Sequence, residues 1–197
     1  MRPHLNKEIT IKPIRTMINH STTEIFFDNL EVSQDCLVGE EGQGFNYILD
    51  GLNAERLLIA SECIGDAKYF IDKSVNYANQ REVFGRPIGK NQAIQFPIAT
   101  AYAKTMAAEL VLFKGCNQFD EHKACGEEAN IAKLLSAEAS WQAAEATMQT
   151  YGGFAFSEEF NIERKFRETR LYQIAPVSTN MILAYISHKI LGMPRSY

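Results

Sequence analysis

The feature of this 197-residue sequence that most constrains its fold is a long stretch of helical periodicity in its middle. From Gln92 onward, apolar and small side chains recur mostly every third or fourth residue, which places them along one narrow stripe of an α-helix. Such a stripe is typical of a helix packed in a bundle, so we expect its members to form core. They are Ile94, Ile98, Ala101, Thr105, Ala108, Leu112 and Phe119.

The same spacing predicts helices on both sides of this stripe. A long helix precedes it and breaks at 84–87, and an alanine-rich helix follows it and stops at a pair of glycines. A short charged helix and a last helix complete the chain. Ser178 is expected to cap the last helix, because its hydroxyl can accept a hydrogen bond from a free backbone N–H. The predicted ranges are 45–79, 127–150, 160–168 and 178–191.

The first part of the chain has a different pattern. Between residues 8 and 38, β-branched and aromatic residues are frequent, most of all in the run 22–27, and this predicts two or three strands. A glycine-rich connector at 39–44 precedes the helical spacing. We therefore expect a mainly helical fold in two parts, strands in 1–38 and helices in 39–197. Two or three strands make a poor independent sheet because their edges stay unpaired. We therefore expect another element to complete the sheet.

Composition narrows the classes of function. Lys and Arg number 20 against 24 Asp and Glu, with both signs interspersed, so there is no basic stripe of the kind that binds nucleic acid. No apolar run approaches the roughly 20 residues that span a bilayer, and residues 1–4 lack the apolar core of a signal peptide. We expect a soluble cytoplasmic protein, or a mitochondrial matrix protein if its source is eukaryotic, with neither nucleic-acid nor membrane partners.

The cysteines are widely separated. They form no Cys-x-x-Cys pair, and no histidine stands at metal-ligand spacing from them. We expect buried free thiols and no metal site. The cysteines are Cys36, Cys63, Cys116 and Cys125.

Seven short stretches stand in a fixed order along the chain. They are Glu24-Ile-Phe-Phe-Asp-Asn-Leu, Gly39-Glu-Glu-Gly-Gln-Gly-Phe, Glu55-Arg56, Gln80-Arg-Glu-Val-Phe-Gly, Asn91-Gln-Ala-Ile-Gln-Phe, Gln149-Thr-Tyr-Gly-Gly and Arg167-Glu-Thr-Arg-Leu-Tyr-Gln. Together they resemble the acyl-CoA dehydrogenase family of flavoenzymes. The resemblance implies a C-terminal four-helix up-down bundle preceded by the last strands of a middle β-domain, with the N-terminal half of the usual protein absent.

The resemblance also implies an activity. It is the oxidation of an acyl-CoA thioester to the 2,3-enoyl-CoA, in which a carboxylate removes an α-proton and a hydride passes to flavin adenine dinucleotide (FAD). In many members the base is a glutamate just before the last helix, where this chain has Pro176, which cannot act as a base. Other members carry it on the first long helix directly before an arginine, so Glu55 is the expected catalytic base.

Glu55 stands among apolar residues of that helix, where an isolated carboxylate would be costly to bury without a purpose. From spacing alone, the alternative is a solvated or ion-paired glutamate. The resemblance implies that Arg56 and Val177 bind substrate. In the family, the N–H at the Pro176 position helps polarise the thioester carbonyl, and proline has no N–H. Either the loop is shifted by a residue, or the oxyanion is stabilised differently.

The resemblance assigns eight residues to FAD, here called the FAD-assigned residues. Arg81 would hold the pyrophosphate, because a planar guanidinium can bind two phosphate oxygens. The glycines would let the main chain approach an FAD held by a neighbouring subunit. The alternatives are an ion pair with Glu82 or Asp72 for Arg81, a helix stop for the glycines, and helix capping for the last two residues. The set is Arg81, Phe84, Gln92, Gln149, Gly152, Gly153, Ser178 and Asn180.

The implied partners are the acyl-CoA substrate, a second copy of the chain in a homodimer or homotetramer, and an electron-transferring flavoprotein. Arg164, Lys165, Arg167 and Arg170 form a local basic cluster that could face CoA phosphates, but glutamates interleave with them, so we expect an ion-pair network instead. Two other functions stay open: a non-catalytic helical bundle that serves assembly, and an acyl-CoA oxidase that reoxidises its flavin with O₂.

Overall fold

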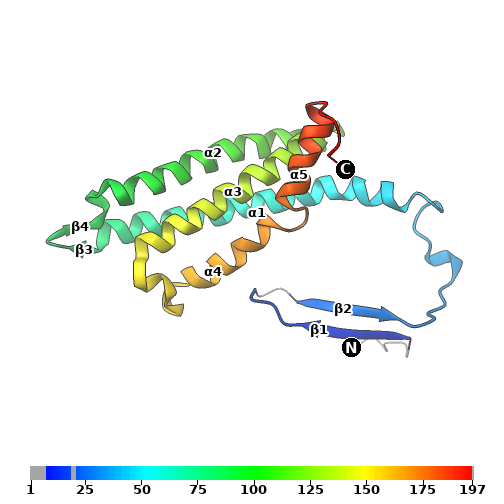
Figure 1. The fold of residues 1–197 in the computed structure, drawn as a ribbon, viewed down its shortest axis with the longest axis horizontal. Coiled ribbons are helices and arrows are strands. Elements are labelled where there is room, and N and C mark those ends of the chain that lie inside the picture. The colour runs from blue at the N-terminus through cyan, green and yellow to red at the C-terminus, as the bar shows by residue number, and fades with distance from the viewer. Residues whose placement is uncertain (1–7, 19–20, 197) are drawn as a thin grey trace. The chain divides into compact units, whose positions relative to one another are not determined.

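The computed structural model describes residues 8–18 and 21–196 of the chain. Its elements divide into two units, one ending at Leu49 and the other beginning at Asp50. The described elements are mainly helical, as the sequence predicts (Figure 1). Residues 1–4, where we expect no signal peptide, lie outside the described part.

A two-stranded antiparallel sheet forms the first unit. Strand β1 (Ile9–Ile14) pairs with β2 (Thr22–Phe27), with Ile11 opposite Ile25. The strands lie where the sequence predicts strands. Their apolar side chains are largely exposed, and Phe27 is 65% accessible. A short 3₁₀ turn at Gln34–Cys36 follows before the chain enters its first helix.

Three long helices and two short ones make up most of the chain. They are α1 (Gly44–Gln80), α2 (Gln92–Asp120), α3 (Gly126–Tyr151), α4 (Ile162–Thr169) and α5 (Thr179–Tyr185). Helices α1, α3 and α4 lie within two residues of the predicted ranges at both ends, and α2 begins at Gln92, where the periodic stripe predicts its start. The last prediction differs, because α5 passes into a π-helical turn at Ile186–Ile190 instead of remaining α-helical to its end.

The core lies where α1, α2 and α3 run side by side (Figure 1). Phe70 of α1 packs there with Ile98 of α2 and with alanines of α3. The predicted stripe on α2 is buried from Ile98 to Leu112, and Ile94 is partly buried against the core. Phe119 is a wrong prediction, since it is 44% exposed. It lies in the last turn of α2, where it lines an open cleft together with Asn53 of α1 and Tyr185 of α5.

The helices approach one another closely at Gly115 of α2. A Cβ at this position would lie 2.8 Å from Leu57 Cδ2 of α1 and 3.2 Å from Glu128 Cβ of α3. Leu57 is only 5% exposed and packs among buried alanines, so it has little room to move. Glycine at this position is therefore a requirement of packing.

The cysteines of the chain, all of them among the described residues, form no disulfide. All four cysteines are free. Cys63 and Cys125 are buried as expected, Cys116 is only partly buried, and Cys36 is exposed, because it lies in the 3₁₀ turn before α1. Burial raises the pKa of the Cys63 thiol.

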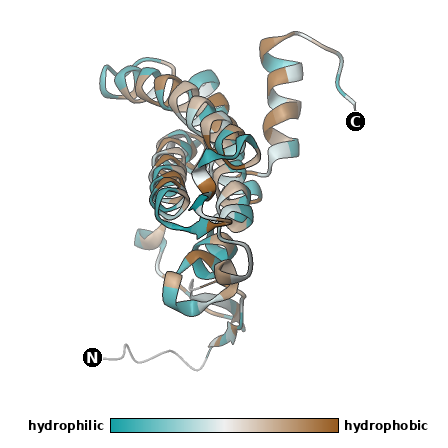
Figure 2. Cartoon of the chain, turned by 90° about the vertical axis from the view of Figure 1, so that its left-hand side faces the viewer, coloured by the Kyte–Doolittle hydropathy of each residue, from teal (hydrophilic) through white to brown (hydrophobic). Residues whose placement is uncertain are grey.

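In the described part of the chain, no helix is long and apolar enough to cross a membrane, and hydrophobic and hydrophilic residues mix along the helices (Figure 2).

Replacing Gly115 with valine should lower the free energy of unfolding by about 1–3 kcal/mol, because added methyl groups overpack the site. The matched control is Gly65→Val on the exposed face of α1, where a Cβ meets nothing within 4 Å. That control should change stability by no more than about 0.5 kcal/mol. Urea unfolding followed by circular dichroism measures both, and equal effects would contradict the packing requirement.

Candidate functional site

A cleft of about 510 Å³ lies where α1 and α3 end. The C-terminal end of α1 places Arg81 on one side of the cleft, and the last turn of α3 places Gln149, Gly152 and Gly153 on the other. Four of the FAD-assigned residues therefore line one cleft, although Arg81 lies 68 positions or more before the other three in the chain. Tyr77, Val83, Thr150, Tyr151 and Phe154 complete the lining.

The glycines leave the main chain of this cleft open. Gly152 ends α3 with a φ of +57°, a conformation that favours glycine, and its N–H donates to the carbonyl of Met148. A Cβ built on Gly152 or Gly153 would meet nothing within 4 Å. The helix stop expected from the residues alone is therefore present, and the same glycines expose backbone at the mouth of the cleft.

No carboxylate of the described residues lines this cleft beside the guanidinium of Arg81. Its guanidinium carbon lies 5.8 Å from the ring centroid of Phe154, within the range of a cation–π contact. No ion pair to Arg81 occurs among the described residues, so the expected alternative of a pair with Glu82 or Asp72 is absent there. An exposed guanidinium of this kind can bind an anion.

Phe84 and Gln92 follow the cleft residues Arg81 and Val83 closely in the sequence, but neither lines the cleft. Phe84 is at the tip of a small hairpin, β3 (Glu82–Val83) and β4 (Arg86–Pro87), with a φ of +53° and a fully exposed ring. Gln92 is the first residue of α2 and is also exposed. Both side chains are free to contact a ligand that extends out of the cleft.

Glu55 is exposed on α1, which corrects the expectation of a buried carboxylate. Leu57 and Ala60 face the core, whereas Leu58 is 68% exposed. Successive helical residues are about 100° apart around the axis, so the apolar sequence neighbours of Glu55 do not surround its side chain. Sequence proximity was therefore a poor guide to burial at this position.

Arg56 is half-buried beside it. Its Nη1 donates to Asn53 Oδ1 at 3.0 Å, and its Nε is buried with no hydrogen-bond partner among the described residues. Burial lowers the pKa of Arg56, while the charges of Tyr185 and Glu55 act in the opposite direction. This unpartnered donor lies on the same helical turn as Glu55.

The segment between α4 and α5 carries the remaining candidates. It consists of a 3₁₀ turn (Arg170–Gln173) followed by a cis Ala175–Pro176 bond and the half-buried Val177. Ser178 Oγ accepts from Met181 N at 3.4 Å, which confirms the predicted cap of α5. Asn180 is exposed at the start of α5. Neither of these FAD-assigned residues lines the cleft between α1 and α3.

Sequence reasoning missed one residue of this region. Lys133 of α3 donates from Nζ to the carbonyls of Tyr172 at 2.6 Å and of Val177 at 2.7 Å. The available signal was a lysine on the buried side of an alanine-rich helix, with Ala129, Ala132 and Ala137 around it in the sequence. Charged residues are rarely buried without a partner, so such a lysine merits attention.

Comparison with known proteins identifies the bundle. The family described as "Acyl-CoA dehydrogenase, C-terminal domain" matches residues 42–191. The chain belongs to the acyl-CoA dehydrogenase family. It is 35% identical over 172 residues to an acyl-CoA dehydrogenase of Bacillus subtilis strain 168, an alignment that covers 87% of this chain and 45% of that protein.

Solved structures of the acyl-CoA dehydrogenase fold agree. Butyryl-CoA dehydrogenase from Megasphaera elsdenii superposes with a TM-score of 0.89 at 28% identity, over 94% of this chain and 49% of that one. A glutaryl-coenzyme A dehydrogenase in complex with glutaryl-CoA gives 0.91 at 28% identity, over 96% and 49%. These comparisons confirm the family and the fold class, and the chain spans about half the length of these relatives.

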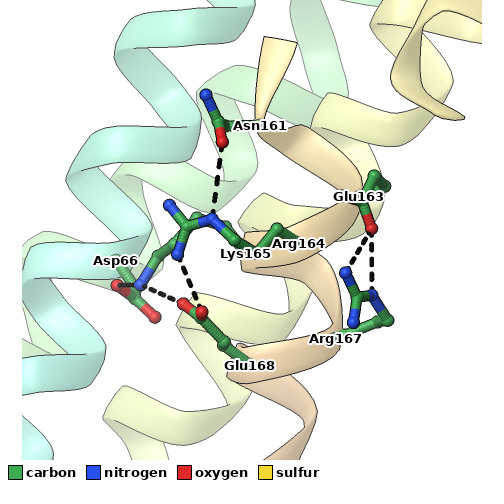
Figure 3. Close-up of polar contacts among 7 residues, drawn as sticks. All are labelled: Asp66, Asn161, Glu163, Arg164, Lys165, Arg167 and Glu168. Carbon is green, nitrogen blue, oxygen red and sulfur yellow. Dashed lines mark hydrogen bonds and ion pairs between the residues drawn. The ribbon is translucent and has the colours of Figure 1, made fainter. Parts of the chain in front are cut away.

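In this member of the acyl-CoA dehydrogenase family, the basic cluster on α4 is an ion-pair network, as the interleaved glutamates predict (Figure 3). Lys165 Nζ lies 2.6 Å from Asp66 Oδ1 on α1 and 3.2 Å from Glu168 Oε2. Burial alone would lower the pKa of Lys165, but the hydrogen bonds and charges of Asp66 and Glu168 outweigh it and raise the pKa. The pair between Lys165 and Asp66 joins α4 to α1.

The other cations of this cluster are also engaged. Arg164 Nη1 lies 2.7 Å from Glu168 Oε1, and Arg167 Nη2 lies 2.7 Å from Glu163 Oε2 (Figure 3). Arg170 lies over the ring of Trp141, with its guanidinium carbon 5.5 Å from the ring centroid. These contacts favour a structural role for the cluster over phosphate binding.

Replacing Lys165 with methionine should lower the free energy of unfolding by about 2–4 kcal/mol, because it leaves the carboxylate of Asp66 buried without its cation. Arg167→Met, which removes a more exposed pair on the same helix, should cost no more than about 1 kcal/mol. Chemical denaturation of both variants measures the difference. Similar losses in the two would show that burial of Asp66 does not matter.

Proposed function

We propose that this chain provides the C-terminal domain for the FAD-dependent oxidation of an acyl-CoA thioester to its 2,3-enoyl-CoA. The observation that carries the proposal is the cleft where Arg81, without a carboxylate partner, meets Gln149 and the open backbone of Gly152 and Gly153. Similarity to proteins named for butyryl-CoA and glutaryl-CoA supports an acyl-CoA substrate.

The residues of the cleft fit FAD. The guanidinium of Arg81 would donate to the pyrophosphate oxygens, and the main chain at Gly152 and Gly153 would approach the same cofactor closely. Phe84 and Gln92 would extend this contact along the adenine. When bound, FAD supplies the acceptor for the hydride that leaves the β-carbon of the substrate.

The same cleft supports a homo-oligomer. The resemblance assigns Gln149 and the two glycines to the FAD of a neighbouring subunit, and Arg81 shares their cleft. One cleft of about 510 Å³ would serve one cofactor, so all four residues would serve the neighbour's FAD. Ser178 and Asn180, which do not line this cleft, would contact the FAD of the chain's own subunit. We therefore propose a homodimer or homotetramer, with an electron-transferring flavoprotein as the electron acceptor.

The proposed base is Glu55. Its carboxylate is exposed on α1, so it is accessible to a substrate, and it would remove the α-proton of the thioester. The resemblance assigns substrate contacts to Arg56, the next residue along α1, and to Val177, which is half-buried on the segment before α5. Pro176 has no N–H to offer the thioester carbonyl, and other donors would have to polarise it.

Glu55→Gln tests the base. The variant should retain FAD, yet the bleaching of its flavin absorbance by acyl-CoA under anaerobic conditions should slow at least about 100-fold, because the amide cannot accept the α-proton. Glu138→Gln, on the exposed surface of α3, is the control and should bleach at the wild-type rate. Normal bleaching in Glu55→Gln would rule out this residue as the base.

The unsubstituted chain separates the competing functions in the same assay. Protein that stays colourless after incubation with FAD would favour a non-catalytic bundle that serves assembly. Release of peroxide on reoxidation in air, at the rate of substrate turnover, would favour an acyl-CoA oxidase.

Arg81→Ala tests the cofactor cleft. Loss of a charged donor to phosphate should raise the Kd for FAD by about 10- to 100-fold. The matched control is Arg86→Ala in the adjacent hairpin, because Arg86 does not line the cleft and its Nη2 donates to Asn91 instead. Titration with FAD, followed by flavin fluorescence, measures both, and equal Kd values for Arg81→Ala and wild type would exclude the assignment.

A further inference from the structure

A fully buried lysine lies in the interior of the bundle. Lys133 of α3 has no accessible surface, and no ion pair to it occurs among the described residues. Burial lowers the pKa of Lys133; the nearby Cys63 acts in the opposite direction, and the charge of Arg56 lowers it further. Desolvating an ammonium group is costly, so the contacts it makes should have a purpose.

Those contacts join the two ends of one segment. The ammonium donates to the carbonyl of Tyr172 at 2.6 Å and to that of Val177 at 2.7 Å, so one group sets the separation of two points five residues apart. Hydrogen bonds from a charged donor are stronger than neutral ones. Proline at 176 gives this segment one N–H fewer with which to form bonds of its own.

Other bonds hold the same segment along one side of α3. Gln173 Nε2 donates to the carbonyl of Ala137 at 2.8 Å, and just before the segment the hydroxyl of Thr169, the last residue of α4, is hydrogen-bonded to that of Ser140. Positions 133, 137 and 140 are one turn apart, so they form a single row on the helix. Lys133 occupies the end of this row nearest to Val177 and α5.

We propose that Lys133 is a positioning residue, whose two hydrogen bonds fix the segment 172–178 against α3 and thereby set the positions of Val177 and the start of α5. The ligand-binding consequence rests on the proposed function, because it takes Val177 as a substrate contact and Ser178 and Asn180 as FAD contacts. The tether itself does not depend on that function. Nothing in this role requires Lys133 to touch substrate or cofactor.

Hydrogen–deuterium exchange of the full chain, without ligands, tests the tether. In Lys133→Met, which keeps the length but not the donors, the amides of residues 171–179 should exchange about tenfold faster, because the loss of charged hydrogen bonds favours local opening. Amides of α2 between 101 and 112 should change less than about twofold. Ser136→Ala on the same helix is the control: Ser136 is equally buried and its hydroxyl has no partner among the described residues, so its variant should match wild type.

Unchanged exchange at 171–179, or an equal increase throughout the bundle, would overturn the proposal, since the second result describes a residue that merely stabilises the fold. Lys133→Gln keeps a neutral NH₂ group in place of the ammonium. Its exchange in the same segment should lie between that of wild type and that of Lys133→Met. If Lys133→Met does not fold, Lys133→Gln decides by the same comparison of segment and α2.

A second measurement separates this inference from the proposed function. In FAD-loaded protein, Lys133→Met should raise the Kd for butyryl-CoA by about tenfold, with partial recovery in Lys133→Gln. If wild type binds neither FAD nor butyryl-CoA, the proposed function fails while the exchange result still decides the tether. If wild type binds both and exchange at 171–179 is unchanged in the variant, the tether fails and the proposed function stands.

Discussion

Close packing of α1, α2 and α3 through small residues is the constraint on which the rest of the bundle depends. Alanines of α3 face both neighbouring helices, and Gly115 leaves room where a Cβ would strike Leu57. Backbones that approach this closely allow polar contacts within the core, such as the bond between Ser74 of α1 and Thr147 of α3 at 2.8 Å. The small side chains therefore determine how closely the three helices pack against one another.

Charged groups attach the later, shorter elements to this framework. Lys165 joins α4 to Asp66 of α1, and Lys133 of α3 holds the carbonyls of the segment that leads into α5. Neither α4 nor α5 is long enough to form a stable helix by itself in water. Their positions consequently depend on a few directional contacts as well as on buried Ile162 and Ile182.

The candidate functional residues lie at the ends of this framework or on its surface, where side chains and backbone are accessible. Arg81 and the glycines occupy the ends of two long helices, and Ser178 caps the start of the short helix α5. A rigid core positions such residues, while loops and helix ends supply the contacts. This division explains why residues of the core, such as Phe70, have no part in the proposed chemistry.

The sequence by itself determined the helices, the strands and the family. Periodicity predicted the start of α2 near Gln92, and glycine and serine marked the end of α3 and the start of α5, because these signals act over a few neighbouring residues. Tertiary structure alone decided which distant residues meet. It brought Arg81 to Gln149, left Glu55 and Phe119 exposed, and gave Lys133 its two carbonyl partners. Burial and contact depend on the direction in which a side chain leaves its helix and on what packs there, and neither can be read from the residues beside it in the chain.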